Sequence, residues 1–224
     1  MKGKLFVVST PIGNLKDITL RAIETLKEVD VILCEDTRRA LKLLNHYGIK
    51  KKLISYFKGK EIEKINIVED ILNQGKDIAL ISDSGTPCIQ DPGFVLIKNL
   101  REKGYEVIPI PGPSSLTCAL SVSGIYSNNF LFLGFLPKRN SKRKKVLKNA
   151  KEIGKTCIIF LSPHEKEKVL PQIFEIFGDK RVYIGRELTK IFEEHFYGNL
   201  KDALEWIKDK KGEFVLIIEG NGKV

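Results

Sequence analysis

The chain of 224 residues contains few of the residues that commonly bind metals or form disulfides. It has three histidines and four cysteines, and no two cysteines form a CxxC pair. Because there is no histidine–cysteine cluster, we expect neither a structural zinc site nor metal catalysis. We interpret the cysteines as four buried free thiols of a reducing compartment: Cys34, Cys88, Cys118 and Cys157.

Long apolar runs are also missing. No window approaches the roughly 18 uncharged apolar residues of a membrane span, so we expect no membrane-spanning segment. Near the amino terminus only Leu5–Val8 are consecutive apolar residues, which is too few for a signal peptide and predicts a cytoplasmic protein. With 42% apolar and 29% charged residues, the composition is that of a folded globular chain.

The common nucleotide and nucleophile motifs are absent as well. There is no GxGxxG and no Walker sequence, so dinucleotide and P-loop nucleotide binding lose their usual support. No GxSxG motif or Cys/His arrangement indicates acyl transfer.

The positive charge is concentrated in one segment. The chain has 38 Lys and Arg against 28 Asp and Glu, a formal net charge of +10. Residues 138–151 hold eight of the basic residues and no acid, so the rest of the chain has 30 basic and 28 acidic residues. The apolar residues Val146, Ala150 and Ile153 recur at helical spacing, which predicts a helix that packs one face and exposes the other.

Such a charge run is most often a solvated helix face. Eight cations without compensating acids instead favour contact with a polyanion. The candidate contact residues are Lys138, Arg139, Lys142, Arg143 and Lys145.

Apolar, β-branched runs alternate with helical patterns in the first half of the chain. Several of these runs are continuously apolar, as expected for a mainly parallel sheet with helices on both faces. The predicted strands are Leu5–Val8, Val29–Cys34, Lys52–Ser55, Ile78–Ser82 and Glu106–Ile110, and the predicted helices are 19–28, 37–47, 61–74, 93–103 and 114–123.

In the second half the strand candidates follow one another more closely, which predicts a mixed sheet with a hairpin. The predicted strands are Phe130–Leu136, Cys157–Leu161, Val182–Gly185, Phe192–Tyr197 and Phe214–Ile218, and the predicted helices are 142–153, 164–177 and 200–209. Pro111-Gly112-Pro113 ends a strand before a new helix begins, so we place the domain junction there, between an α/β domain of residues 1–111 and a second α/β domain of residues 112–224.

Four polar loops follow strands of the first domain, where ligands of open α/β sheets bind. They are Ser9–Asn14, Cys34–Arg39, Ser82–Gly93 and Pro111–Ser115. Each also has an ordinary interpretation as a turn or helix cap, with capping by Asp17 or Thr19, by Asp36 or Thr37, or by Ser114. A cap does not explain Glu35, so a polar site remains an equal alternative there.

Several motifs occur in a fixed order along the chain: TPIGNL at 10–15, EDTR at 35–38, SDSGTP at 82–87 with DPG at 91–93, PGPS at 111–114, GFLP at 134–137, RELTK at 186–190 and KGE at 211–213. Together they resemble the ribosomal RNA small subunit methyltransferase I family. This is the bacterial 16S rRNA cytidine 2′-O-methyltransferase branch of the tetrapyrrole methylase superfamily, and the resemblance covers essentially the whole chain.

The resemblance implies two α/β domains of the tetrapyrrole methylase type, with S-adenosylmethionine held in the cleft between them. Carried over position by position, the cofactor-binding residues are Pro11, Asp83, Gly85, Thr86, Ser114 and Ser115, with Phe160, Leu161, Gly212 and Glu213 in the second domain. It also implies a cytoplasmic homodimer, without a metal or a membrane, that methylates 16S rRNA in the small ribosomal subunit and binds RNA through the basic segment.

The sequence departs from the family pattern in two places. Many members have Glu-Ser-Pro-His-Arg where this chain has Leu161 to Glu165, and many continue into a further helical region beyond the KGE strand.

Methyl transfer to a ribose hydroxyl is an in-line displacement that depends on alignment of oxygen, carbon and sulfur. The hydroxyl proton must leave, which indicates a carboxylate within hydrogen-bond reach. Glu35, Asp36 and Glu187 are the candidates, with Arg38 as an anchor for a phosphate or carboxylate. Two alternatives stay open: another methyltransferase of the superfamily, such as a corrinoid precursor C-methyltransferase, and a non-catalytic RNA-binding module of ribosome assembly.

Overall fold

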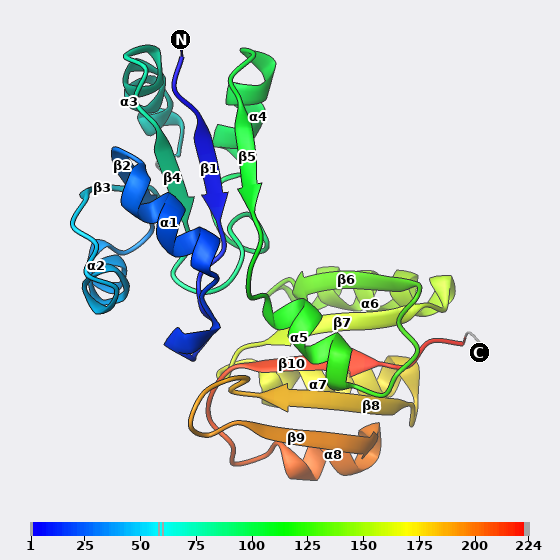
Figure 1. Ribbon diagram of the computed structural model, residues 1–224. Coiled ribbons are helices and arrows are strands. Elements are labelled where there is room, and N and C mark those ends of the chain that lie inside the picture. The colour runs from blue at the N-terminus through cyan, green and yellow to red at the C-terminus, as the bar shows by residue number, and fades with distance from the viewer. Residues whose placement is uncertain (1, 58, 60, 222–224) are drawn as a thin grey trace. The chain divides into compact units, whose positions relative to one another are not determined.

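The structure is a computed structural model that describes residues 2–57, 59 and 61–221. It divides into two compact units, Met1–Ser114 and Ser115–Val224, and each unit contains one five-stranded sheet. Figure 1 shows the elements of both units in chain order.

The first unit is a parallel sheet with the strand order β3-β2-β4-β1-β5. Its elements are β1 (Leu5–Val8), the short helix η1 (Leu15–Asp17), α1 (Leu20–Glu28), β2 (Val31–Cys34), α2 (Thr37–His46), β3 (Lys52–Ser55), α3 (Glu61–Asn73), β4 (Ile78–Ile81), α4 (Phe94–Glu102) and β5 (Val107–Ile110). Every residue of β2 and β4 is buried, because helices cover both faces of the sheet.

Two separate apolar clusters account for these layers. Leu26 of α1 and Leu44 of α2 pack with Ile32 and Ile81 on one face of the sheet. On the other face, Leu72 of α3 and Leu100 of α4 belong to the second cluster, with side chains from β1, β2 and β4. Since all five strands are parallel, their carboxyl ends meet at one edge, and the loops there lie together.

The second unit has a mixed sheet with the strand order β6-β7-β10-β8-β9. Its elements are α5 (Ser115–Val122), β6 (Phe130–Phe135), α6 (Asn140–Ile153), β7 (Thr156–Leu161), α7 (Lys166–Phe177), β8 (Arg181–Arg186), β9 (Glu194–Asn199), α8 (Leu200–Trp206) and β10 (Phe214–Ile218). Only β6 and β7 pair in parallel, and β8 and β9 form the expected hairpin-like antiparallel pair.

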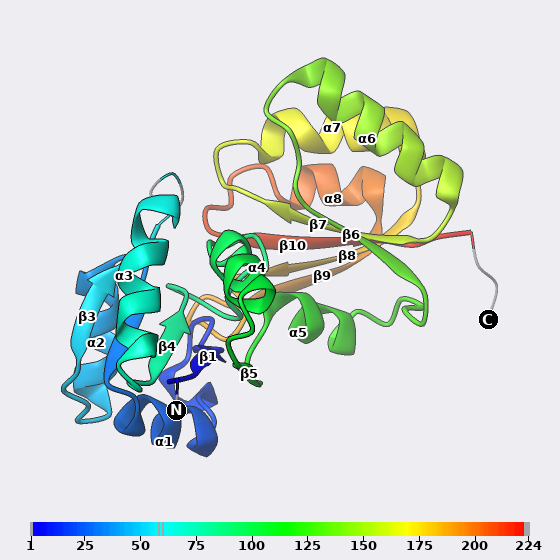
Figure 2. The same ribbon diagram turned by 90° about the horizontal axis from the view of Figure 1, so that it is seen from above.

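The helices of the second unit cover its sheet unequally. In Figure 2, α6, α7 and α8 lie on one side of the sheet and α5 on the other. The main core lies under α6–α8, where Leu147, Ile173 and Leu200 pack on Ile159 and Leu216. On the opposite face α5 contacts β10.

The predicted fold class is confirmed: a parallel α/β sheet followed by a mixed one. Two strands begin later than predicted. Residues from Val29 were expected in a strand, but Val29 ends α1 by donating its N–H to the Thr25 carbonyl, so β2 begins at Val31. The strand expected from Phe192 begins at Glu194 instead, and the Phe192 side chain is 71% exposed.

Residues 111–113 contact other parts of the first unit. A Cβ on Gly112 would lie 3.0 Å from Cβ of Ser9, and the Pro113 carbonyl accepts a hydrogen bond from Thr86. The compact units therefore divide three residues beyond the predicted junction at residue 111.

The cysteines correct one expectation. Cys34 and Cys157 are buried, but Cys88 and Cys118 are only partly buried. Cys88 lies in the loop before α4 with a positive φ of 71°, and Cys118 lies on α5, so neither is enclosed as a strand residue is. Burial raises the pKa of the Cys34 thiol to about 11, and the carboxylates of Asp83 and Asp36 act in the same direction.

Candidate active site

The loops after β1, β4 and β5 are tied together at the carboxyl edge of the first sheet. Thr10 and Gly85 exchange both backbone hydrogen bonds, at 2.8 and 3.0 Å. The Thr86 hydroxyl donates to the Pro113 carbonyl at 3.1 Å, and so it accepts from the Ser9 hydroxyl, which lies 3.0 Å away. The side chain of the predicted cofactor residue Thr86 thus joins the three loops.

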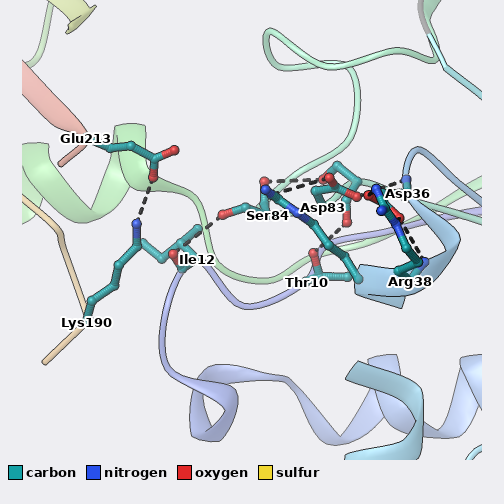
Figure 3. Close-up of polar contacts among 10 residues, drawn as sticks. Thr10, Ile12, Asp36, Arg38, Asp83, Ser84, Lys190 and Glu213 are labelled. Atoms are coloured by element: carbon teal, nitrogen blue, oxygen red, sulfur yellow. Dashed lines mark hydrogen bonds and ion pairs between the residues drawn. The ribbon is translucent and has the colours of Figure 1, made fainter. Parts of the chain in front are cut away.

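Gly85 is required by this arrangement. Its φ of +81° is in the region that favours glycine, and a Cβ there would lie 3.2 Å from Cγ2 of Ile12. Pro11 and Ile12 are buried beside it. The Ser84 hydroxyl donates to the Ile12 carbonyl at 3.5 Å, a contact shown in Figure 3. The β1 and β4 loops therefore approach each other backbone to backbone.

Asp83 joins the fourth loop, which follows β2, to this group. Its Oδ1 accepts the backbone N–H of Asp36 at 3.2 Å, and its Oδ2 lies 3.4 Å from Nη1 of Arg39. The Asp83 side chain is 22% exposed, so its carboxylate still reaches the surface. All four predicted loops are thereby linked, and Figure 3 shows Thr10, Asp36 and Asp83 within this group.

Glu35 is the carboxyl group with the most unusual surroundings. Its Oε1 is buried and has no hydrogen-bond partner among the described residues. Burial, together with the nearby carboxylates of Asp91 and Asp83, raises the pKa of Glu35 to about 7, and Arg39 opposes this rise only in part. A carboxyl group of this pKa at the end of a buried strand is suited to accept a proton near neutral pH.

Asp36 and Arg38 form a local pair instead. The Asp36 side chain accepts the backbone N–H of Arg38 at 2.8 Å and thereby caps α2. The Arg38 guanidinium also donates to both carboxylate oxygens, at 3.1 and 2.8 Å. These hydrogen bonds lower the pKa of Asp36 to about 2. Of the two predicted caps, Asp36 is the one observed, and its carboxylate is a poor proton acceptor.

In the second unit, Glu187 stabilises the turn before β10. Its Oε1 accepts the Glu213 backbone N–H at 2.8 Å and lies 3.1 Å from Nζ of Lys190. Burial opposes ionisation, but these donors and Arg186 outweigh it and lower the pKa of Glu187. Lys190 also pairs with Glu213 at 2.8 Å (Figure 3).

The remaining predicted cofactor residues occupy different positions. Gly212 has a φ of +116°, and a Cβ on it would lie 2.7 Å from Cγ of Glu187. Glu213 is exposed, Leu161 is buried in the core and Phe160 is half-buried on the opposite face of the sheet. Ser114 and Ser115 are half-buried where α5 begins.

The basic helix α6 differs from the prediction. Its buried residues are Arg143, Leu147 and Ala150, whereas Ile153 of the expected apolar stripe is 55% exposed. The spacing of 143, 147 and 150 turns the face with Leu147 to the core, and Val146 packs against the same core while only partly buried.

Arg143 is therefore not a surface cation. Only 6% of it is exposed, its Nε donates to Oε1 of Gln172 at 2.7 Å, and its Nη1 donates to the carbonyls of Pro137 and Lys138, both at 3.3 Å. Its burial argues against the expected contact with a polyanion, and its guanidinium instead fixes the segment before α6.

Other cations of the segment stay on the surface. Lys144 pairs with Glu175 at 2.9 Å, and Lys151 donates to the Ile176 carbonyl. The exposed basic residues with no acidic partner among the described residues are Lys138, Arg139, Lys142, Lys145 and Lys148. We call these five residues the basic surface.

Three contributors lie in the polar loops that the sequence indicates but were not assigned a site role there: Ser9, Arg39 and Asp91. Ser9 precedes the TPIGNL motif and Arg39 follows EDTR, so their nearness to the motifs was the available signal. Their roles depend on contacts between residues more than 40 positions apart, such as Arg39 with Asp83. Within the described residues, no group of three or more His, Cys, Asp or Glu could hold a metal ion, and no helix is long and apolar enough to span a membrane.

Comparisons with known proteins identify the family and the fold. The sequence model of the family described as Tetrapyrrole (Corrin/Porphyrin) Methylases matches residues 4–204. A crystal structure of diphthine synthase superposes with a TM-score of 0.77 at 16% identity, and the match covers 98% of this chain and 90% of that one. At that identity the likeness shows the fold alone. Fold and motifs together define the class as a tetrapyrrole-methylase-type methyltransferase.

Two curated relatives identify the family within this class. The Ribosomal RNA small subunit methyltransferase I of Halalkalibacterium halodurans is 45% identical, over 99% of this chain and 78% of that protein. The protein of the same name from Thermotoga maritima is 44% identical, over 97% of this chain and 99% of that protein. The chain belongs to the ribosomal RNA small subunit methyltransferase I family, and the family resemblance expected from the motifs is confirmed.

Proposed function

We propose that this protein transfers a methyl group from S-adenosylmethionine to the ribose 2′-hydroxyl of a cytidine in 16S rRNA of the small ribosomal subunit. The observation that carries the proposal is the 44–45% identity, over nearly the whole chain, to proteins named for ribosomal RNA small subunit methylation. The base-specific and 2′-O-specific parts of the proposal rest on the motif resemblance.

The linked loops of the first unit fit the proposed methyl donor. Asp83 offers a partly exposed carboxylate for a cationic group, and Gly85, which has no side chain, permits close approach to the loop backbone. We assign the contacts to Pro11, Asp83, Gly85, Thr86, Ser114 and Ser115. For the second unit, the assignment of Phe160, Leu161, Gly212 and Glu213 stays a prediction from the resemblance. When bound, S-adenosylmethionine supplies an activated methyl group on a sulfonium centre.

Glu35 is the proposed general base. A base works best when its pKa lies near the working pH, and the pKa of Glu35 is about 7. Asp36 has a pKa of about 2 and holds Arg38 with both oxygens, and Glu187 is engaged by Glu213 and Lys190. Among the three candidate carboxylates, only Glu35 has a buried oxygen without a partner in the described chain.

Arg38 remains the proposed anchor for a substrate phosphate. Its side chain is 86% exposed, and the Asp36 carboxylate fixes one edge of its guanidinium. The other N–H groups of the fork are therefore oriented and available for an anion. We further propose that the basic surface contacts rRNA, and that the active form is a cytoplasmic homodimer, as the resemblance implies.

The test is methylation of small ribosomal subunits that lack the modification, with labelled S-adenosylmethionine. Label on a cytidine ribose supports the proposal, whereas label on a base or on protein contradicts the reaction. Calorimetry with S-adenosylmethionine alone separates the enzyme from a non-catalytic RNA-binding module, because such a module would show no binding heat.

A further inference from the structure

Phe135 is an exposed aromatic side chain at the carboxyl end of β6. It is 51% exposed, and its ring centroid lies 5.5 Å from that of Phe160 on β7. Phe132 contacts the same Phe160 ring at 5.0 Å. The three rings form an aromatic group whose outermost member reaches solvent.

An irregularity in β6 places Phe135 in this group. Phe132 pairs with Ile158, and the register then shifts so that Gly134 pairs with Ile159 and Phe135 with Phe160. Leu133 is the extra residue, and Gly134 has a φ of 58°. Without the shift, strict alternation would turn Phe135 to the same face as Leu131 and Leu133, which pack on the core under α6. The bulge thus turns an apolar ring away from the core, as bulges near functional sites do.

The basic surface begins directly after this ring. Lys138 follows Phe135 by three residues, so their Cα atoms lie within about 11 Å. The Arg143 guanidinium holds the carbonyls of Pro137 and Lys138, both at 3.3 Å, which fixes the direction of the intervening chain. An exposed ring therefore lies three residues before Lys138, the first residue of the basic surface.

We propose that Phe135 is a stacking platform for an unpaired nucleobase of the RNA substrate, with the flanking phosphates on the basic surface. This inference rests on the proposed rRNA substrate. Single-stranded RNA is recognised by bases stacked on aromatic rings next to cations that follow the backbone, and Phe135 with the basic surface supplies both. A polyanion without bases would use only the cations.

The test compares two probes: a fluorescein-labelled oligopyrimidine RNA of about 12 nucleotides and inorganic polyphosphate. Stacking on one ring changes affinity by about 5- to 140-fold, so Phe135→Leu should weaken RNA binding at least about 5-fold and leave polyphosphate binding unchanged. Phe135→Trp should restore RNA binding. Phe130→Leu is the matched control, because Phe130 is a 39% exposed ring at the opposite end of the same strand.

A second measurement reads the stacking directly. In Phe135→Trp the new indole emission should be quenched by RNA and not by polyphosphate, while the Trp206 emission of the wild type stays unchanged. RNA affinity of Phe135→Leu within twofold of wild type would overturn the inference. So would equal weakening of both probes, which indicates a disturbed basic surface, or loss of S-adenosylmethionine binding alone, which assigns the ring to the cofactor.

The outcome is separable from that of the proposed function. Suppose that Phe135→Leu weakens RNA binding but the wild-type protein does not methylate small subunits. That result would contradict the proposed reaction and leave the stacking inference standing. Methylation that is unaffected by Phe135→Leu, with RNA affinity also unchanged, would contradict only the stacking inference.

Discussion

The backbone N–H of Asp36 donates to Oδ1 of Asp83 at 3.2 Å, and this hydrogen bond joins the loops that follow β2 and β4. It brings the carboxylate of Asp83 close to Glu35, the neighbour of Asp36 in the chain. Burial, Asp91 and Asp83 then raise the pKa of Glu35, and Arg39 partly opposes them. This contact thus adds the Asp83 carboxylate to burial and Asp91, which are the larger causes of the raised pKa of Glu35.

Replacement of this base provides the first prediction. Glu35→Gln keeps the shape of the side chain but removes the proton acceptor, so we expect the single-turnover methylation rate to fall about 100-fold or more. S-adenosylmethionine affinity measured by calorimetry should change little. A variant that retains more than a tenth of the rate would exclude Glu35 as the general base.

The same group predicts two dependences on pH. The carboxylate form is needed to accept the proton, so the wild-type rate should rise with pH through about 7 and then level off. The folded-state pKa of Glu35 is also above its usual value of 4.5, so its contribution to stability is lost as pH rises from about 4.5 to about 7. The Tm of Glu35→Gln should therefore improve relative to wild type as the pH rises from about 4.5 to about 7, and the difference should level off above that.

Glu187 should behave in the opposite way. Since Glu187 holds Glu213 and Lys190, Glu187→Gln should lower the free energy of unfolding by about 1 kcal/mol and leave the rate per folded enzyme unchanged. Its pKa is lowered, so its contribution is present above pH about 4.5 and lost at lower pH. Glu205→Gln is the control, because the Glu205 side chain is 84% exposed. A loss of rate without a loss of stability in Glu187→Gln would return Glu187 to the catalytic candidates.

Replacement of Arg143 tests whether this residue of the basic segment stabilises the fold. Arg143→Met would leave the Gln172 amide oxygen and two carbonyls without their donor, so we expect a loss of about 2–3 kcal/mol of stability. Lys145→Met removes one exposed cation and leaves the rest of the basic surface in place, so it should leave the Tm unchanged and weaken RNA binding. Thermal unfolding of the two variants decides the matter, and equal Tm values would contradict the structural role.

Much of the fold could be predicted because its signals are local. The fully apolar runs at Ile78–Ile81 and Phe214–Ile218 become buried strands, and Thr19 and Asp36 cap α1 and α2. The errors came from residues that satisfy two patterns at once. Arg143 belongs to a cationic run and also fits the buried position of the period 143, 147 and 150, and only packing against α7 selects the second.

The loops that form the candidate site could be predicted, but the roles of the individual residues could not. Polar residues after parallel strands identified Glu35, Asp36 and Asp83 as neighbours of one edge. The difference between Glu35 and Asp36 depends on burial and on which carboxylate Arg38 reaches, and adjacent residues of similar type carry no such signal. The bulge that exposes Phe135 depends on the register of β6 against β7, which is likewise not a local property.

The basic surface makes a prediction about salt. If its five exposed cations each contact one phosphate, log affinity for single-stranded RNA should fall against log salt with a slope of about −3.5. Changing Lys142 and Lys145 together to Gln should reduce the magnitude of that slope by about 1.4. The matched control removes the same charge elsewhere, with Lys27→Gln and Lys201→Gln on exposed positions of α1 and α8. Because counterion release depends on the phosphates actually contacted, an equal change in slope for both double variants would mean that RNA senses only net charge, and that the footprint is not on α6.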